Sequence, residues 1–482
     1  MKLSNAVEAV AARPLFRGAR FGIAIFPLGE DRAVYALNEG ELFAAASVTK
    51  IPTCVTALER LGADYRFRTP VLRYGEIDGE GILHGDLVLV ASGDPNLSNR
   101  VSADTLSFFD VDHAMGNHLA ARPVAGDRLT VLRALAEQVR NSGIRRIDGH
   151  IVVDVSLFTG AGREGGTGVS VSPVSVNDNM VDVRVIPSEK IGEPPALEFH
   201  PVASCFTYDN RAKTAKPGSQ PALRFVDDEE PRDPAIVTIT GEVPQGPAFW
   251  TRYCVPSPRR YAEALFRQAL RESGVDVTRD ETNDVSRTTT GVEVASHTSP
   301  PLSQAVKVVL KVSQNMHAEL LMRACGGGER SAGLRVEREV LEGAGIDVSA
   351  IAQGDAAGGA GCFTPEVMCQ ILQFAARQPY AAVFREALPV MGVDGTLFDI
   401  QRESSAVGSV RAKTGTSGYP DDLNSGGFLS AKSLAGYLDA QSGRSYVFTV
   451  FANNIHCAAG PEGHHEIGES LGEIAVAARA LL

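Results

Sequence analysis

An extended stretch becomes a helix between Phe43 and Gly62, and this junction constrains the fold more than any other part of the chain. Apolar side chains recur there at helical spacing and predict a buried helix that starts near Ser47, namely Val48, Ile51, Val55 and Leu58. Ser47 and Lys50 are three positions apart, so one helical turn places the hydroxyl and the amine on the same face. Because a desolvated lysine can lose its proton and then accept one from a neighbouring hydroxyl, the pair is a candidate activated nucleophile.

The Ser47–Lys50 pair does not establish this chemistry by itself. A serine that caps a helix, followed by a surface lysine, produces the same pattern. In the catalytic interpretation, the backbone N–H groups and the positive dipole of the helix N-terminus would also stabilise an oxyanion. The choice between the two interpretations depends on whether the rest of the chain supplies partners for Ser47.

Two further short motifs supply such partners. Ser313-Gln314-Asn315 falls between helices predicted at 301–312 and 316–325, where a serine can relay a proton and an asparagine can bind a substrate amide. Lys413-Thr414-Gly415-Thr416 falls where a predicted strand runs into a turn. There the lysine keeps the field positive, the threonines can hold a carboxylate, and the glycine lets a substrate approach the backbone. Each motif alone is typical of an ordinary turn, but all three in this order favour catalysis.

The two ends of the chain predict one sheet. Strands are predicted at 21–26 and 33–37, joined as an antiparallel hairpin, and at 409–415, 434–438 and 445–453. We therefore expect an α/β (α+β) fold with a five-stranded antiparallel sheet. Terminal helices at 4–12 and 466–482 would cover one face, and a helical cluster that includes 331–344 and 365–376 would cover the other.

A long insertion lies between these ends, since 263 positions separate Lys50 from Ser313. Residues 181–255 are rich in strand formers, proline and charge, which predicts a small β-rich module. We expect three domains: a discontinuous one of 1–66 and 292–482, a first inserted domain of 67–180 and 256–291, and a second inserted domain of 181–255 nested in the first. The tract 279–291 is polar and predicts a loop.

Composition and charge exclude several classes of protein. The net charge of −12 argues against a nucleic-acid partner and against docking on anionic lipid. No apolar run approaches the roughly 18 residues of a membrane-spanning helix, so we expect no transmembrane segment. Residues 1–20 lack the apolar core of a signal peptide.

The seven cysteines argue against a structural metal site, because none forms a C-x-x-C pair. We expect no metal and no cofactor. Cys205 and Cys254 could pair as a disulfide in an exported protein, and spacing does not decide this. Cys54, Cys325 and Cys369 are expected to be buried free thiols.

With its three motifs in this order, the chain resembles the low-molecular-mass class C penicillin-binding proteins, the D-alanyl-D-alanine carboxypeptidase/endopeptidase family. The resemblance covers nearly the whole length, and the long gap between the first two motifs is a further mark of it. It includes Gly85 to Pro95, Arg145 to Gly149, Val176 to Asn179, Met316 to Leu321 and Leu388 to Leu397. It implies a penicillin-recognising transpeptidase/β-lactamase-like domain that carries two nested inserted domains.

The resemblance also implies the activity of a serine D-Ala-D-Ala carboxypeptidase, a DD-endopeptidase, or both. Ser47 would attack the D-Ala-D-Ala carbonyl and form an acyl-enzyme, with Lys50 as general base and Ser313 as the relay of a proton to the leaving amine. Asn315 would orient the substrate amide, and the backbone N–H groups of Ser47 and Thr416 would form the oxyanion hole. The other substrate-binding residues would be Lys413, Thr414, Gly415 and the Thr416 side chain.

The partners implied by the resemblance are peptidoglycan peptides that end in D-Ala-D-Ala or in D-Ala–diaminopimelate cross-links, and β-lactam antibiotics. Such proteins act in the periplasm or elsewhere outside the cytoplasmic membrane, so a signal peptide would have been removed from this chain. The oligomeric state stays open, with a homodimer among the alternatives.

Two local departures from the family pattern stand out. Gln314 occupies a position where the family often has aspartate, and this slot is not catalytic. The segment 354–361, Gly-Asp-Ala-Ala-Gly-Gly-Ala-Gly, stands where the family often shows Asp-Gly-Ser-Gly-Leu. This second departure bears on the local loop and on substrate preference.

Other interpretations of the sequence compete with this one. Gly468 to Gly472 matches the nucleophile-elbow pattern G-x-S-x-G, but no aspartate or histidine follows it. A metal site could be drawn from His456, Cys457, His464 and His465, although their spacing fits no standard site. The same three motifs also serve β-lactamases and D-aminopeptidases, which differ in deacylation. A non-catalytic scaffold that binds peptidoglycan is the remaining alternative.

Overall fold

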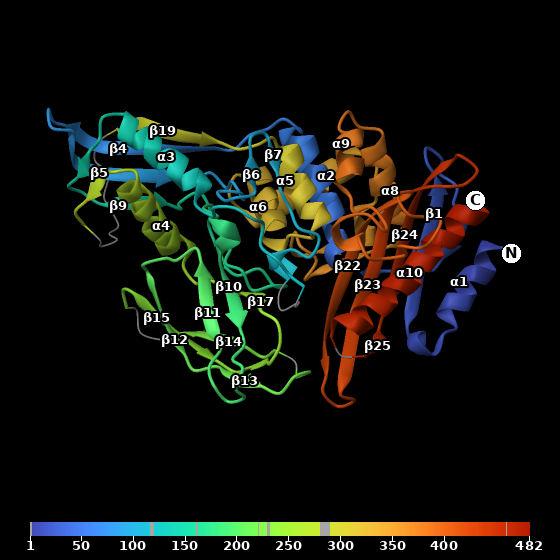
Figure 1. Ribbon diagram of the computed structural model, residues 1–482. Coiled ribbons are helices and arrows are strands. Elements are labelled where there is room, and N and C mark those ends of the chain that lie inside the picture. The colour runs from blue at the N-terminus through green and yellow to red at the C-terminus, as the bar shows by residue number, and fades with distance from the viewer. Residues whose placement is uncertain are drawn as a thin grey trace. The chain divides into compact units, whose positions relative to one another are not determined.

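The computed structural model describes residues 2–115, 120–160, 162–219, 221–228, 232–279, 290–458 and 460–482. The chain forms two compact units, one of Met1–Tyr65 with Pro301–Leu482 and the other of Arg66–Pro300 (Figure 1). The loop predicted at 279–291 lies mostly outside the described residues. The finer division of the insertion into two nested domains stays a prediction.

The first unit is built on a sheet whose strands come from both ends of the chain (Figure 1). The strand order is β2-β1-β24-β23-β22, every pair is antiparallel, and the short β25 pairs with β23. The expected five-stranded sheet is confirmed, with β25 as an additional strand. The bounds are β1 (Arg20–Pro27), β2 (Tyr35–Leu37), β22 (Val410–Asp421), β23 (Gly426–Asp439), β24 (Ser445–Asn453) and β25 (Ile455–Cys457).

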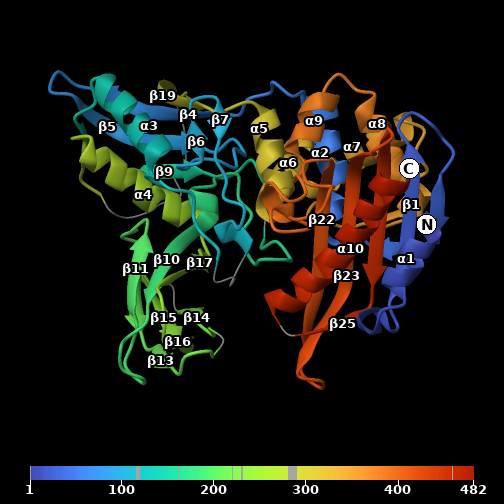
Figure 2. The ribbon, with the colours of Figure 1, turned by 45° about the vertical axis from the view of Figure 1, so that its right-hand side comes forward.

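Helices cover both faces of this sheet (Figures 1 and 2). Helices α1 (Leu3–Ala11) and α10 (Pro461–Leu481) share one apolar cluster with alternate residues of the strands. On the other face α8 packs against β1 and β24, where the Cys369 thiol donates to the Ala24 carbonyl at 3.4 Å. The remaining helices are α2 (Lys50–Leu61), α5 (Leu302–Lys311), α6 (Asn315–Cys325), α7 (Arg330–Gly343), α8 (Pro365–Ala376) and α9 (Ala381–Ala387).

Helix α2 is the buried centre of the helical layer. It contacts α5, α6, α7 and α8, and its residues 50–58 are all buried. The helix ends at Gly62, whose φ of 88° is the left-handed conformation that favours glycine at a helix C-terminus. The helix was predicted to start near Ser47, but α2 starts at Lys50, and Ser47 lies in the 3₁₀ turn η2 (Ala46–Thr49) that leads into it.

The strand predicted at 409–415 is confirmed, but the turn predicted at its end is wrong. Strand β22 runs without interruption from Val410 to Asp421 and pairs with β23 along this length, with a bulge between Ser417 and Gly418. Gly415 serves close approach, because a Cβ there would lie 2.5 Å from the Ala45 carbonyl and 3.2 Å from the Ser47 nitrogen. The glycine therefore lets the strand pack against the turn that carries Ser47.

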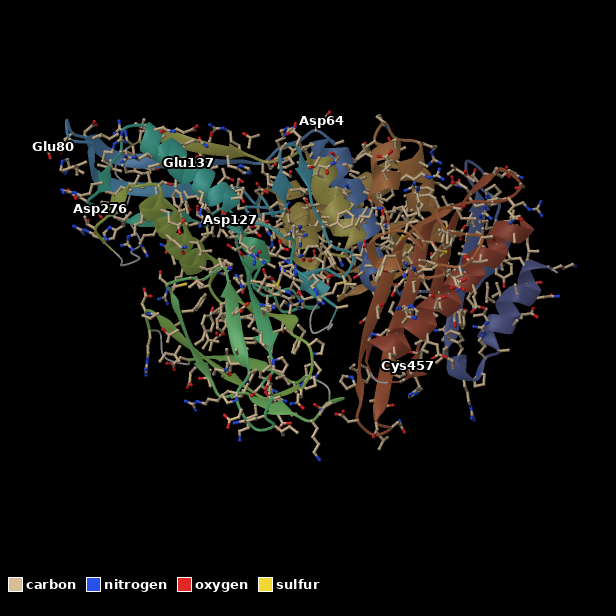
Figure 3. All side chains as sticks on the ribbon, in the orientation of Figure 1. Asp64, Glu80, Asp127, Glu137, Asp276 and Cys457 are labelled. Atoms are coloured by element: carbon tan, nitrogen blue, oxygen red, sulfur yellow. The ribbon has the colours of Figure 1, made fainter. Side chains whose placement is uncertain are left out.

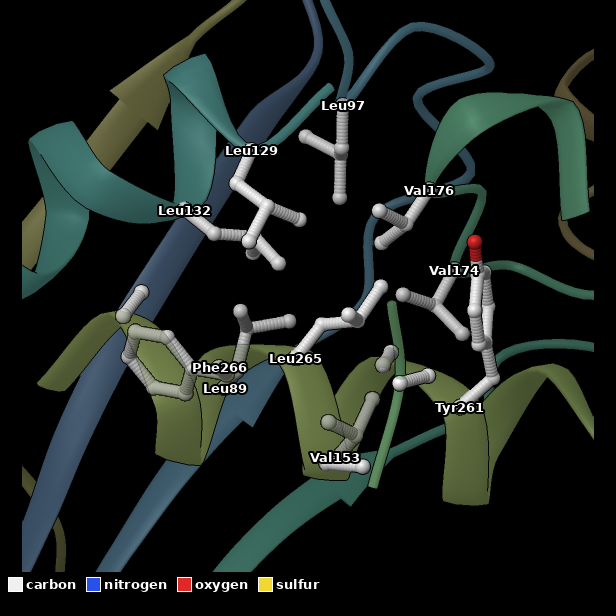
Figure 4. Packing of buried hydrophobic residues seen from close by; sticks show 14 of the residues in the cluster. Leu89, Leu97, Leu129, Leu132, Val153, Val174, Val176, Tyr261, Leu265 and Phe266 are labelled. Carbon is white, nitrogen blue, oxygen red and sulfur yellow. The ribbon is translucent and has the colours of Figure 1, made fainter. Parts of the chain in front are cut away.

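The second unit contains a six-stranded sheet and several smaller ones. The larger sheet has the order β18-β8-β5-β4-β19, with β9 paired to β5. Its strands are β4 (Arg68–Ile77), β5 (Ile82–Val90), β8 (Arg146–Ile147), β9 (Ile151–Asp154), β18 (Asp276–Val277) and β19 (Val292–Thr298). The helices are α3 (Thr130–Asn141) and α4 (Pro258–Glu272), and Figure 4 shows Leu132 of α3 and Phe266 of α4 in their shared apolar core.

Residues 181–255 are β-rich, as expected from the sequence. Strand β10 (Met180–Ile186) lies between β11 (Ala196–His200) and β17 (Phe249–Cys254). A second sheet has the order β12-β15-β14, and β13 pairs with β16. The bounds are β12 (Phe206–Asn210), β13 (Lys213–Ala215), β14 (Arg224–Asp227), β15 (Ala235–Thr240) and β16 (Glu242–Pro244).

The described residues include all seven cysteines, and each is a free thiol. Cys205 and Cys254 are therefore not paired here. Cys54 and Cys369 are buried as expected, whereas Cys325 is partly exposed. Across the described ranges, no helix combines the length and apolar composition needed to cross a bilayer.

Candidate active site

Lys50 lies at the centre of a polar site in the first unit. Its side chain is completely buried, and its Nζ donates to Ser47 Oγ at 2.8 Å, to Asn315 Oδ1 at 2.6 Å and to the Ala357 carbonyl at 2.7 Å. These partners come from the turn before α2, from the start of α6 and from the loop before β21 (Gly361–Phe363). An amine so enclosed is held within hydrogen-bond reach of the serine hydroxyl, which is the geometry that proton transfer requires.

Strand β22 closes the site beside Ser47. Lys413 is completely buried and donates from Nζ to the Thr414 carbonyl at 2.7 Å. Burial and the charge of Lys50 hold the pKa of Lys413 well below its usual range. The Thr414 hydroxyl donates to Thr396 Oγ1 at 2.7 Å, so the short helix η6 (Gly395–Leu397) holds the side chain of Thr414 in place.

The connection between α5 and α6 carries the middle motif. Ser313 is partly exposed and has a φ of 59°, a conformation that is uncommon for a residue with a Cβ. Asn315 is the first residue of α6 and contacts Lys50. The end of α5 is fixed by Lys311, whose Nζ lies 2.6 Å from Asp394 Oδ1. Backbone strain of this kind is often found at functional sites, where the surrounding structure maintains it.

Asp355 organises the loop of residues 354–361. Its carboxylate accepts hydrogen bonds from the backbone N–H groups of Ala357, Gly358, Gly359 and Ala360, at 2.6 to 3.2 Å. Gly358, with a φ of 103°, packs so closely that a Cβ would lie 2.0 Å from the Ala46 carbonyl. The Ala45 N–H donates to the Gly361 carbonyl at 3.0 Å. The loop therefore buttresses the turn that holds Ser47.

Glu319 of α6 supports the same loop from beneath. Its Oε1 accepts from the Ala356 N–H at 2.9 Å, and the Ala356 carbonyl accepts from Thr53 Oγ1 at 3.2 Å. Burial raises the pKa of Glu319. The next peptide presents the Ala357 carbonyl to Lys50, so Glu319 lies one residue behind a direct contact of the site.

Sequence reasoning did not assign a role to Ala357, Asp355, Glu319 or Thr396. Asp355 carried a recognisable signal, since an aspartate before a run of small residues is typical of a loop whose N–H groups turn toward one carboxylate. The Ala357 carbonyl carried none, because a backbone acceptor does not depend on the side chain. A pocket of about 400 Å³ lies beside this loop, with lining residues that include Ala46, Gly354, Gly359, Cys362, Ser417 and Ser430.

A different buried cluster lies in the second unit. Arg100 donates to both oxygens of Asp112 and to Asp178 Oδ2, each at 2.8 Å. His113 lies between two carboxylates, 2.6 Å from Asp182 Oδ1 and 2.8 Å from Asp178 Oδ2. Burial alone would lower the pKa of His113, but Asp182 and Asp112 raise it to about 10. Arg128 completes the cluster through Asp182 Oδ2 at 3.1 Å.

This cluster also bears on the metal hypothesis. Within the described residues, the three metal-type side chains whose donor atoms lie within 4.8 Å of one another are Asp112, His113 and Asp178. Their donor atoms already contact Arg100 or each other, which is the pattern of an ion-pair network. The carboxy-terminal set around His456 and Cys457 does not come together in this way.

The nucleophile-elbow interpretation of Gly468 to Gly472 does not survive the structure. This segment lies within α10, whereas an elbow needs a sharp turn between a strand and a helix. Ser470 is buried, and its hydroxyl donates to the Glu466 carbonyl at 3.1 Å, one helical turn earlier.

Solved structures share this architecture. The chain superposes on the crystal structure of penicillin binding protein 4 (dacB) from Haemophilus influenzae with a TM-score of 0.75 and 20% identity, covering 99% of this chain and 98% of the other. A structure of that protein complexed with a novel β-lactam gives 0.73 at 21% identity, covering 97% of each chain. The chain therefore has the fold of this penicillin binding protein.

Sequence comparison then gives the family. The D-Ala-D-Ala carboxypeptidase 3 (S13) family model matches residues 3–473, so the chain belongs to this family and is a serine hydrolase of the D-alanyl-D-alanine carboxypeptidase kind. The D-alanyl-D-alanine carboxypeptidase of Actinomadura sp. (strain R39) is 28% identical, covering 95% of this chain and 82% of that protein. D-alanyl-D-alanine carboxypeptidase DacB of Haemophilus influenzae is 23% identical, covering 90% and 86%.

Proposed function

We propose that the chain hydrolyses peptidoglycan stem peptides through an acyl-enzyme on Ser47, as a D-Ala-D-Ala carboxypeptidase, a DD-endopeptidase or both. The observation that carries the proposal is the 2.8 Å contact between Lys50 Nζ and Ser47 Oγ inside a buried site that also contains Asn315 and Lys413. Lys50 takes the serine proton as Ser47 attacks the D-Ala carbonyl carbon. Ser313 relays this proton from Lys50 to the departing amine, and water then hydrolyses the acyl ester and restores the Ser47 hydroxyl.

The charges of Lys50 and Lys413 oppose each other in this buried site. Because the charge of Lys50 contributes to the lowered pKa of Lys413, a proton on both amines at once is unfavourable. A pair that carries one proton keeps a neutral amine for the base and a positive field for the substrate. The same field stabilises the negative charge that develops on the carbonyl oxygen during attack.

Most of the remaining roles belong to strand β22, which lies at the edge of the sheet. The backbone N–H groups of Ser47 and Thr416 form the oxyanion hole, and Gly415 allows the strand to lie this close to Ser47. Asn315 orients the substrate amide. Thr414, Thr416 and the field of Lys413 bind the carboxylate on the leaving-group side, while the pocket beside residues 354–361 receives the acyl side of the peptide.

The proposal extends to partners and place of action. β-Lactams, whose ring amide mimics the scissile bond, would acylate the same serine, and the enzyme would act outside the cytoplasmic membrane on D-Ala-D-Ala termini and D-Ala–diaminopimelate cross-links. The insertion would comprise the domains 67–180 with 256–291 and 181–255. We also propose that the chain associates to a homodimer, which sedimentation analysis would test.

Intact-protein mass spectrometry after incubation with benzylpenicillin tests the proposal. The wild type should gain the mass of one penicilloyl group, and digestion should place it on Ser47. The Ser47→Ala variant should gain none. An unmodified wild type would overturn the enzyme proposal, and an adduct that persists in Ser47→Ala would overturn the site.

The lifetime of the adduct separates the peptidase from the remaining alternatives. An adduct that lasts many minutes supports the peptidase, whereas rapid turnover of a chromogenic cephalosporin supports a β-lactamase. A scaffold without activity would bind peptidoglycan fragments and show neither result. The carboxypeptidase activity is then measured directly with a diacetyl-Lys-D-Ala-D-Ala peptide, by monitoring the D-alanine that hydrolysis releases.

A further inference from the structure

Lys432 lies on the strand next to β22, which carries the Lys413 motif. It belongs to β23, where its cross-strand partner is Thr416 of β22. Directly paired residues of neighbouring strands present their side chains on the same face of the sheet. The Lys432 Nζ donates to Thr416 Oγ1 at 3.1 Å, so an ammonium is joined to a hydroxyl that belongs to the proposed carboxylate site.

The surroundings of Lys432 keep its ammonium in place. The side chain is half-buried beneath α10, where Gly468 provides room: a Cβ there would lie 3.6 Å from Lys432 Cε and 3.7 Å from Nζ. The titratable groups that face it are Asp399, Cys457 and His464, and Figure 3 labels Cys457 near the start of α10. Burial lowers the pKa of Lys432 to about 8.

The direction of this hydrogen bond has a chemical consequence. A threonine hydroxyl has one proton and two lone pairs, whereas an ammonium only donates and a carboxylate only accepts. When Lys432 donates to the Thr416 oxygen, the hydroxyl proton is left for an acceptor on its other side. The positive charge also polarises the hydroxyl and strengthens the bond that it donates.

We propose that Lys432 is a positioning residue for carboxylate recognition: through Thr416 Oγ1 it selects peptides whose residue after the scissile bond carries a free α-carboxylate. The inference rests on the proposed function, because it takes Thr416 as a ligand of that carboxylate. It names a substrate requirement, since a peptide with a terminal carboxamide presents a neutral group with N–H donors at the same place.

Steady-state kinetics on two matched peptides test the inference. One peptide ends in D-Ala-D-Ala with a free carboxylate, and the other ends in D-alaninamide. For Lys432→Met we expect KM for the carboxylate peptide to rise about tenfold with kcat within about twofold, the size of one charge-assisted hydrogen bond. The amide peptide should be unaffected. Lys432→Arg should restore the low KM, because arginine keeps the charge and the donors.

Lys213→Met is the matched control, since Lys213 is an exposed strand residue of the second unit and its loss removes the same charge. It should leave both peptides unchanged. In the wild type, KM for the carboxylate peptide should also rise as the pH passes about 8, where Lys432 loses its proton. The Lys432→Arg variant should not show this rise, because arginine stays charged.

The outcomes separate this inference from the proposed function. A wild type that does not acylate at Ser47 overturns the proposed function, and a wild type that acylates but treats the two peptides alike overturns the proposed carboxylate site. A wild type that prefers the carboxylate peptide, together with a Lys432→Met variant that keeps the full preference, overturns the role of Lys432. An equal loss on both peptides also overturns it, because that result marks a structural lysine.

Discussion

Two buried charged clusters of this molecule follow opposite rules. In the second unit, each carboxylate faces a cation, and the arginine, the histidine and the aspartates hold one another in fixed ionisation states. In the first unit, Lys50 donates to three neutral oxygens and has a second buried lysine as its neighbour. One cluster balances its charges, and the other concentrates charge of one sign.

This difference explains what each cluster can do. A balanced network raises the pKa of His113 to about 10, so its protonation does not change near neutral pH. Burial and the charge of Lys50 lower the pKa of Lys413 and make a proton easy to lose from the pair. Unbalanced burial of charge is costly for folding, and it is typical of sites that move protons. The contrast assigns stability to one cluster and chemistry to the other.

The largest expected effect comes from removing the base. Lys50→Met should lower the rate of acylation by benzylpenicillin by at least about 10⁴-fold, as the loss of a catalytic base or nucleophile does in serine peptidases. Stopped-flow acylation with a fluorescent penicillin measures the rate. Lys50→Arg keeps the charge but cannot act as a base at neutral pH. An active Lys50→Arg enzyme would show that the site uses charge alone. The first unit's cluster would then not transfer protons, and the contrast with the second unit's cluster would be wrong.

The balanced cluster should respond in stability rather than in activity. Asp178→Asn keeps the shape and suits the φ of 54° at this position, but it removes a charge shared by Arg100 and His113. We expect the second unit to lose about 3–5 kcal/mol of unfolding free energy, the usual result of breaking a buried ion pair from one side. Urea unfolding followed by Trp250, the single tryptophan of the chain and a residue of β17, measures this loss.

The matched control for Asp178→Asn is Asp209→Asn, which breaks a largely exposed ion pair with Arg211 in the same unit. It should cost less than about 1 kcal/mol. Acylation of Ser47 by penicillin should stay at the wild-type rate in both variants. A slow acylation in Asp178→Asn, with Trp250 still reporting a folded unit, would contradict the division of labour between the two clusters.

The pH dependence of stability gives a third test. The pKa of His113 is raised from 6.5 to about 10 on folding, so its contribution is fully present below pH 6.5 and is lost as the pH rises through 10. A native state that binds one more proton loses about 1.4 kcal/mol per pH unit, so we expect a loss of about 2–3 kcal/mol between pH 7 and pH 9. His113→Gln should be less stable at pH 7 and should lack this slope in the Trp250 signal.

The sequence carried the fold and the positions of the motifs because these depend on local pattern. Spacing of three residues brought Ser47 and Lys50 together, and alternating apolar strands at both ends predicted the sheet. The supports of the site depend on contacts between distant positions, such as Ala357 with Lys50 and Lys432 with Thr416. Gly415 shows the same limit: the sequence predicted that the strand ends there in a turn, but the strand continues, and the close approach of Ser47 explains the glycine.

The smallest expected effect comes from the support beneath the loop. Glu319→Ala removes the acceptor of the Ala356 N–H and leaves that buried group without its bond, so the neighbouring Ala357 carbonyl should be held less firmly against Lys50. We expect acylation by penicillin to slow about tenfold, since a lost backbone anchor is worth about 1–2 kcal/mol. Glu319→Gln keeps an oxygen acceptor and should acylate at nearly the wild-type rate.

Two comparisons show whether Glu319 acts as an acceptor in this way. Glu342→Ala removes a carboxylate that pairs with Arg338 on the surface of α7, and it should change neither acylation nor melting. If Glu319→Gln slows acylation as much as Glu319→Ala, then the negative charge matters, and the site is not the one-signed cluster contrasted above with the balanced network. If Glu319→Ala acylates at the wild-type rate, Asp355 alone is sufficient to hold the loop. The positive site would then depend on its own loop and not on the helix beneath it.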